Sequence, residues 1–180
     1  MDPEFIREIF TGLDEHNLPI GGSFSDPVGN TVIPFLCESH PFIALYHPVM
    51  LNEETYRAAS RWVLDDANHQ ISDNAYMMKF ASMAEWCDGN HYAPLRALPS
   101  VNFTIRHRIP QRLASATQGF LTEVPTADEL YFIPGGDTEA RTSRLNLWYS
   151  RVSDRIAVDQ LGLRTIHPTS GNYWYGYRKA

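Results

Sequence analysis

Strand-like and helical segments alternate in the second half of the sequence, and this alternation constrains the fold more than any other feature. Residues 101–107 (VNFTIRH) have an apolar side chain at every second position, and residues 129–134 and 173–178 are short aromatic and β-branched runs. Helical patterns separate them, one beginning at Pro110 and one over roughly 143–161. Because parallel strands need a long connection, usually a helix, the pattern predicts a partly parallel sheet.

The first half of the sequence predicts two strands followed by two helices. Residues 31–37 and 42–46 are β-branched and aromatic runs, and Pro34 confines the first of them to an edge or a bulge. Asn52 and Ser72 are suitable N-cap residues for helices over roughly 53–66 and 73–87. The whole sequence therefore predicts one α/β or α+β domain, a mixed sheet flanked by helices in the order ββ-αα-βαβαβ.

Composition agrees with a single folded domain. The 180 residues are 43% hydrophobic and include only two cysteines, which excludes a disordered chain and a disulfide scaffold. Residues 1–5 (MDPEF) read as a cloning remnant, so residues 6–180 are taken as the globular domain. With no run of about 18 apolar residues and no signal-peptide pattern, we expect an intracellular, cytoplasmic protein that does not enter a membrane.

Charge is unevenly distributed and points to a possible anion site. Residues 1–100 contain 5 basic and 14 acidic groups, whereas residues 101–180 contain 10 basic and 7 acidic groups. Arg106, Arg108 and Arg112 cluster where the predicted strand leads into a helix N-terminus. Free N–H groups and the helix dipole favour an anion there, so these arginines are candidate phosphate ligands. The alternative is a basic turn that pairs with the acidic first half of the chain.

A second set of basic residues follows one face of the predicted 143–161 helix. Arg144, Trp148, Arg151 and Arg155 are spaced at i, i+4, i+7 and i+11, within one narrow stripe. An arginine and tryptophan stripe can bind a nucleic-acid backbone by charge and by stacking. A solvated helix face explains the same stripe, and the overall acidity of the chain favours that interpretation.

Two cysteine and histidine pairs raise the question of a metal. Cys37 and His40 form one pair, and Cys87 and His91 form the other. Two cysteines and two histidines suffice for a tetrahedral zinc site. Their spacings match no compact zinc finger, so we expect buried structural thiols and no metal.

Two aromatic segments are candidate interaction surfaces. The predicted 73–87 helix has few polar positions and presents Tyr76, Met77 and Phe80, while Tyr173 and Tyr175 lie in the aromatic C-terminal run. Such surfaces favour either a protein partner, including a second copy of the chain, or burial in the core.

From residue 101 to residue 178, the succession of strand, basic turn, helix, strand, long helix, Leu-Gly-Leu and closing strand resembles the C-terminal half of the GCN5-related N-acetyltransferases. The resemblance implies that RHRIPQR at 106–112 occupies the turn that binds the pyrophosphate of acetyl-CoA. It also places RIAVDQLGL at 155–163 at the helix end that precedes the last strands. The basic turn contains no glycine, and Val158 stands where many members of the family have a tyrosine as general acid, so no catalytic acid is implied.

These observations leave an enzyme and a non-catalytic protein both open. The first hypothesis is an acyl-CoA-dependent N-acyltransferase in which Arg106, Arg108 and Arg112 bind the phosphates of acetyl-CoA or another acyl-CoA. The second is a protein-interaction or structural module of a larger assembly. Nucleic-acid binding through the 143–161 helix is the third.

Overall fold

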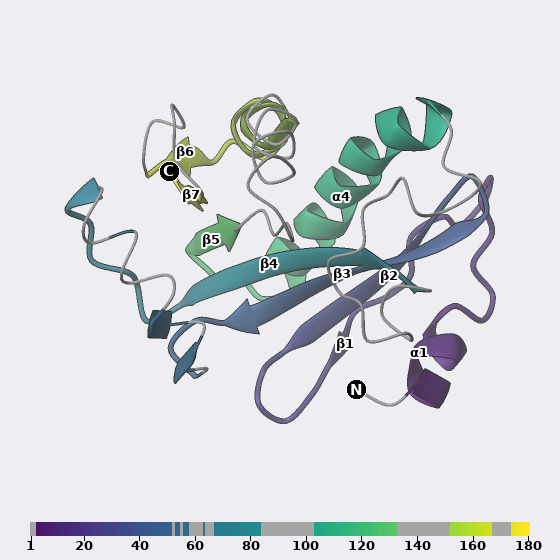
Figure 1. Cartoon of the computed structure of the whole chain (residues 1–180), viewed down its shortest axis with the longest axis horizontal. Helices are drawn as coiled ribbons and strands as arrows, with labels where there is room; N and C mark the ends of the chain where they lie inside the picture. Colours follow the sequence, from purple (N-terminus) through teal and green to yellow (C-terminus); the bar gives the residue numbers. More distant parts are fainter. Residues whose placement is uncertain are drawn as a thin grey trace, which may run out of the picture.

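A mixed β-sheet with helices on both faces forms the structure, a computed structural model (Figure 1). The structure describes residues 3–51, 53–54, 56–57, 63, 67–83, 103–132, 152–166 and 174–180. Along the chain, the elements are α1 (Pro3–Ile9), β1 (Phe24–Ser25), β2 (Thr31–Cys37), β3 (His40–Pro48), β4 (Ala75–Ser82), α4 (Phe103–Glu123), β5 (Glu129–Phe132), the π-helix η2 (Arg155–Gln160), β6 (Arg164–Thr165) and β7 (Tyr175–Arg178). Within these residues, no helix is long and apolar enough to cross a membrane.

The strand order is β1-β2-β3-β4-β5-β7-β6, and among these described strands one neighbouring pair is parallel. Strands β1 to β4 pair antiparallel, whereas β4 and β5 pair parallel, with α4 in the connection between them. Strand β7 then pairs antiparallel with both β5 and β6. The predicted fold class, a mixed sheet with helices packed against it, is therefore confirmed.

Helix α4 covers one face of the sheet because its apolar residues recur every three or four positions. Ile109, Leu113, Ala116 and Phe120 are all buried against the sheet. Phe120 stacks on Tyr46 with the two ring centroids 4.0 Å apart, and the Tyr46 hydroxyl lies 3.0 Å from Thr117 Oγ1. This pairing lets a buried tyrosine keep a hydrogen bond inside an apolar layer.

The opposite face of the sheet is covered in part by α1 (Figure 1). Ile9 of α1 is buried with Val32, Ile43 and Leu45 from strands β2 and β3. Phe5, within the segment expected to be a cloning remnant, packs edge-on against Phe24 with a centroid distance of 5.7 Å. Because each strand alternates its side chains between the two faces, β2 and β3 contribute to both apolar layers.

Two of the predicted elements are wrong. Residues 103–107 of the predicted 101–107 strand form the beginning of helix α4, and Pro110, expected at a helix start, lies inside that helix. Residues 101–102 lie outside the described part of the chain. The alternation of Val101, Phe103 and Ile105 covers too few residues to distinguish a strand from a helix. Ile105 also fits the three- and four-residue spacing of the apolar residues further along α4.

The predicted 73–87 helix is also wrong over residues 75–82, which form strand β4. Apart from the exposed Lys79, the residues of this central strand are buried or partly buried, so its sequence AYMMKFAS is apolar nearly throughout and lacks the alternation of a half-exposed strand. The element order ββ-αα-βαβαβ is therefore not the one observed in the described residues.

Several other elements are confirmed. Strand β2 has the predicted bounds, β3 contains the predicted 42–46 strand, and β5 and β7 cover most of the predicted 129–134 and 173–178 strands. The described residues of the 53–66 segment, 53–54, 56–57 and 63, are helical. Of the 143–161 helix, residues 152–160 are described and helical.

Candidate functional site

The parallel strands β4 and β5 end at the same edge of the sheet. Their register runs from Ala75 opposite Glu129 to Met78 opposite Phe132, and β4 continues to Ser82. In sheets with parallel strands, ligands bind beside the carboxyl ends of the strands, where the strand order or direction changes. Among the described strands β4 and β5 are the one parallel pair, so this edge is the first place to look for a site.

An apolar pocket lies at this position, between the sheet and the helices α4 and η2. Its cavity volume is about 60 Å³, several times the roughly 10–15 Å³ that a single water needs. The described residues that line it come from five elements and the segments beside η2: Met78, Phe80, Leu113, Thr117, Leu130, Tyr131, Phe132, Val152, Ser153, Ile156, Ala157, Leu161, Leu163 and Tyr177. None of these side chains is charged, so the pocket suits an apolar group.

The hydroxyl groups on the lining residues are already engaged elsewhere. Thr117 donates to the carbonyl of Leu113 at 2.8 Å, and Tyr131 donates to Glu129 at 2.8 Å. Tyr177 donates to Asp154 Oδ1 at 2.8 Å, and burial together with that carboxylate raises the pKa of Tyr177. The hydroxyl groups of Thr117, Tyr131 and Tyr177 therefore each have a hydrogen-bond partner, which leaves the apolar parts of these residues to form the pocket wall.

One wall of the pocket is a π-helix, a conformation that is rare and often occurs at functional sites. The N–H of Leu161 donates to the carbonyl of Ile156 at 3.0 Å, the five-residue spacing of a π-turn. Gly162 ends the helix with φ 65°, a backbone conformation that glycine adopts without strain, as Leu-Gly-Leu predicted. The wider turn places Ile156, Ala157 and Leu161 along the pocket. No sequence signal indicated the π-turn.

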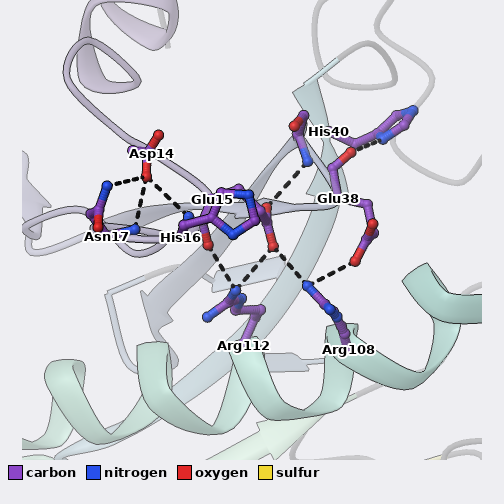
Figure 2. A network of polar contacts seen from close by, with 9 residues as sticks. Asp14, Glu15, His16, Asn17, Glu38, His40, Arg108 and Arg112 are labelled. Atoms are coloured by element: carbon purple, nitrogen blue, oxygen red, sulfur yellow. Dashed lines mark hydrogen bonds and ion pairs between the residues drawn. The ribbon is translucent and has the colours of Figure 1, made fainter.

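Arg108 and Arg112, predicted as phosphate ligands at a helix N-terminus, lie inside helix α4, on a different side from the pocket, and contact carboxylates (Figure 2). Arg112 Nη2 donates to Glu15 Oε1 at 3.0 Å, and Arg108 Nη1 lies 2.8 Å from Glu38 Oε1 and 3.4 Å from Glu15 Oε1. The backbone N–H of Ser39 donates to the second oxygen of Glu15 at 3.2 Å. The predicted alternative, pairing of this basic segment with the acidic first half, is thus confirmed for Arg108 and Arg112. The side chain of Arg106 lies outside the described part of the chain.

The loop that carries Glu15 is itself ordered by Asp14. The Asp14 carboxylate accepts the backbone N–H groups of His16 and Asn17 at 3.0 and 2.8 Å (Figure 2). Burial of Glu15 tends to raise its pKa, but the hydrogen bonds from Ser39 and Arg112 outweigh this and lower the pKa overall. Glu15 is therefore an ionised carboxylate held in an arginine clasp.

The clasp and the pocket lie on separate flanks of α4. At about 100° per residue, Thr117 lies roughly 140° around the helix from Arg112. Thr117 lines the pocket, whereas Arg112 contacts the Glu15 loop. An anion at Arg112 competes with Glu15, and an anion at Arg108 competes with Glu38 and Glu15.

The predicted interaction surfaces are largely inside the molecule. Met77 and Tyr175 are 2% and 1% exposed, so neither presents a contact surface. Tyr76 and Phe80 are half-buried and pack against the core under α4. Covered central strands account for this: their aromatic and methionine side chains fill both apolar layers. Tyr173 lies outside the described residues.

Of the basic helix stripe, the structure describes only Arg155, which is exposed on η2. Arg144, Trp148 and Arg151 lie outside the described residues, so nucleic-acid binding stays a prediction.

In the described ranges, no group of three or more histidine, cysteine, aspartate or glutamate side chains could hold a metal. Cys37 is buried, and burial raises the pKa of its thiol to about 11, so the thiol stays protonated. The ring of His40 is bonded through Nδ1 to the carbonyl of Glu38 at 2.8 Å. Cys87 and His91 lie outside the described part of the chain.

Comparisons with models of known families, with curated proteins and with solved structures found no significant match to the chain.

Proposed function

We propose that the chain binds an acyl-CoA and acts as an acyl-CoA-dependent N-acyltransferase, with the acyl chain in the pocket beside β4 and β5. The observation that carries the proposal is the position of an uncharged, apolar pocket at the carboxyl ends of the parallel strands. The succession of α4, β5, a helix ending in Leu-Gly-Leu and a closing strand supports only the later part of the acetyltransferase resemblance, because the continuous helix α4 over residues 103–123 replaces its strand-to-helix turn.

The uncharged wall of the pocket favours the acyl chain over the polar parts of the ligand. Each methylene group transferred from water to such a wall contributes about 0.8 kcal/mol, close to a fourfold gain in affinity. Leu130, Ile156 and Ala157 are among the apolar side chains of the wall that would contact the chain. The thioester and the nucleotide then lie outside the pocket, and the rate gain comes chiefly from holding the thioester against an amine.

The phosphates of the cofactor need cationic groups, and Arg106, Arg108 and Arg112 are the proposed ones. In the described structure, Glu15 contacts Arg112 and Arg108, and Glu38 is the closer partner of Arg108. Binding there requires that the cofactor displace the Glu15 carboxylate, so Glu15 competes with the cofactor. A Glu15→Gln variant then binds CoA more tightly than the wild-type chain does.

Calorimetry with octanoyl-CoA and with CoA tests the proposal, together with release of free CoA thiol in the presence of primary amines. Ala157→Phe fills the pocket and weakens octanoyl-CoA binding, while CoA binding is unchanged. Val158→Phe is the matched control, because the neighbouring Val158 is 40% exposed and does not line the pocket. Equal affinities for octanoyl-CoA and CoA in the wild-type chain would refute the acyl site.

A non-catalytic interaction module is the second candidate, and the arginine clasp favours it. If Glu15 holds Arg108 and Arg112 permanently, these side chains tie the first loop to α4 and bind no phosphate. The pocket then accepts an apolar side chain of a protein partner. No binding of acyl-CoA, by the wild-type chain or by Glu15→Gln, supports this second function over the first.

A further inference from the structure

A second group of chemically active side chains lies on the face of the sheet opposite the pocket. His47 of β3 is the central residue of this group. It is opposite Met77 in the register of β3 and β4, and Lys79 is opposite Leu45 on the same face. Met78 and Phe80, the residues of β4 that line the pocket, alternate with Met77 and Lys79 and so point to the other face.

A chain of hydrogen bonds fixes the ring of His47. Asn30 Nδ2 donates to Asp26 Oδ2 at 2.7 Å, which sets the orientation of the Asn30 amide. The amide oxygen of Asn30 therefore faces His47 Nδ1 at 2.8 Å, and Nδ1 must carry the proton that this oxygen accepts. The proton is thus absent from Nε2, whose lone pair is left to act as an acceptor or a nucleophile.

Hydrogen bonds to the Asp26 carboxylate also hold the turn that contains Asp26 and Asn30. Asp26 Oδ1 also accepts the backbone N–H groups of Val28 and Asn30, at 3.0 and 2.9 Å. Gly29 adopts φ 82°, which closes the turn. The imidazole orientation is thus set by the β1–β2 connection and not by its own strand alone.

The charges around His47 favour a neutral ring and an incoming anion. Burial and the ammonium group of Lys79 lower the pKa of His47 to about 4, and the Asp26 carboxylate only partly opposes them. His47 is partly exposed, and Lys79, on the same face of the sheet, is exposed. A cation would be repelled by Lys79, whereas a phosphoryl group would be attracted.

We propose that His47 is a phosphoryl-acceptor site whose Nε2 takes a phosphoryl group from a small donor of the phosphoramidate or acyl phosphate class, with Lys79 stabilising the transferred anion. The Nε2 lone pair forms the new N–P bond, and the bond from phosphorus to the leaving group breaks. The leaving group departs with that electron pair, as ammonia in the case of phosphoramidate. The Nδ1 proton stays on the ring and remains donated to Asn30, so no other reactant is required.

The test is incubation of the full chain with phosphoramidate at neutral pH, followed by phosphorus NMR and peptide mapping under alkaline conditions. We expect phosphorylation of His47. It should be faster than phosphorylation of His16, an exposed histidine of the Asp14 loop. Asn30→Ala, which loses the bond that fixes the ring, slows labelling of His47 roughly fivefold, the worth of one hydrogen bond. Lys79→Gln slows labelling of His47 as well and leaves His16 unchanged.

Peptide mapping of the wild-type chain tests whether His47 is the phosphorylated residue, even if a variant fails to fold. A label on His16 without a label on His47 overturns the proposal. So does a labelling rate at His47 that is the same in a folded Asn30→Ala chain as in the wild type, because a purely structural role for Asn30 would give that result.

Discussion

Replacing Glu15 by glutamine tests the arginine clasp most sharply. The carboxylate of Glu15 is 9% exposed and accepts hydrogen bonds from Arg112 and from the backbone of Ser39. The third contact, 3.4 Å to Arg108, adds little because that guanidinium is 44% exposed. Glutamine keeps the size of the side chain but removes the charge and turns an N–H group toward the arginines.

The expected cost of Glu15→Gln is about 2 kcal/mol of unfolding free energy, roughly 1 kcal/mol for each of the two effective hydrogen bonds. The loss of unfolding free energy in Glu15→Gln is larger at neutral pH than in acid. The pKa of Glu15 in the folded chain lies below its ordinary value of 4.5, so its contribution is present above pH 4.5. It is lost as the pH falls through the folded-state value, and the glutamine variant lacks this part of the acid dependence.

Urea unfolding at several pH values measures both effects. The exposed Glu8, replaced by glutamine, is the matched control and is expected to change stability by less than about 0.5 kcal/mol. A double-mutant cycle of Glu15→Gln with Arg112→Gln should give a coupling of about 1 kcal/mol. A coupling near zero, with no difference between the two variants in acid, would refute the clasp.

Three further outcomes follow from the packing and the charges. Phe120→Ala removes a fully buried ring that stacks on Tyr46 and should cost about 3–5 kcal/mol in urea unfolding; a loss under 1 kcal/mol would contradict this packing. Gly176→Ala places a methyl group 2.8 Å from the Trp174 ring, so we expect a loss of about 1–3 kcal/mol and a lower melting temperature, and an unchanged one would contradict the contact. In an NMR titration, His47 should protonate near pH 4; its neutral folded form then gives stability that is present above pH 6.5 and lost as the pH falls toward 4, whereas titration near 6.5 would contradict its environment.

Local patterns in the sequence predicted much of the sheet, because the strands at issue have clear composition and boundaries. Residues 31–37 end at a tight turn and form β2 as expected. The Leu-Gly-Leu helix end was also predictable, since a positive φ at Gly162 is what such a stop requires.

The errors arose where long-range packing decides the structure. Nearly all residues of strand β4 are apolar because the strand lies between two covered layers. A nearly continuous apolar run fits a helix as well as a strand, so the local pattern could not distinguish them. Residues 103–107 alternate like a strand, yet they extend a helix whose register is fixed by core residues further along.

In the candidate site, too, local features were predictable from the sequence and long-range contacts were not. The pairing of Arg108 and Arg112 with acidic groups was foreseeable from charge alone, but the identity of the partners, Glu15 and Glu38, depends on how the first loop folds back. The pocket joins residues from β4, α4, β5, η2 and β7, so no short motif could indicate it.

The affinity of the chain for acyl-CoAs of increasing length tests the central claim most directly. With the acyl chain inside the pocket, the dissociation constant should fall about fourfold for each added methylene until the pocket is full, and then stop falling. Ala157→Phe should end this fall at a shorter chain, and Val158→Phe should not change it. A dissociation constant that does not depend on chain length would contradict the account.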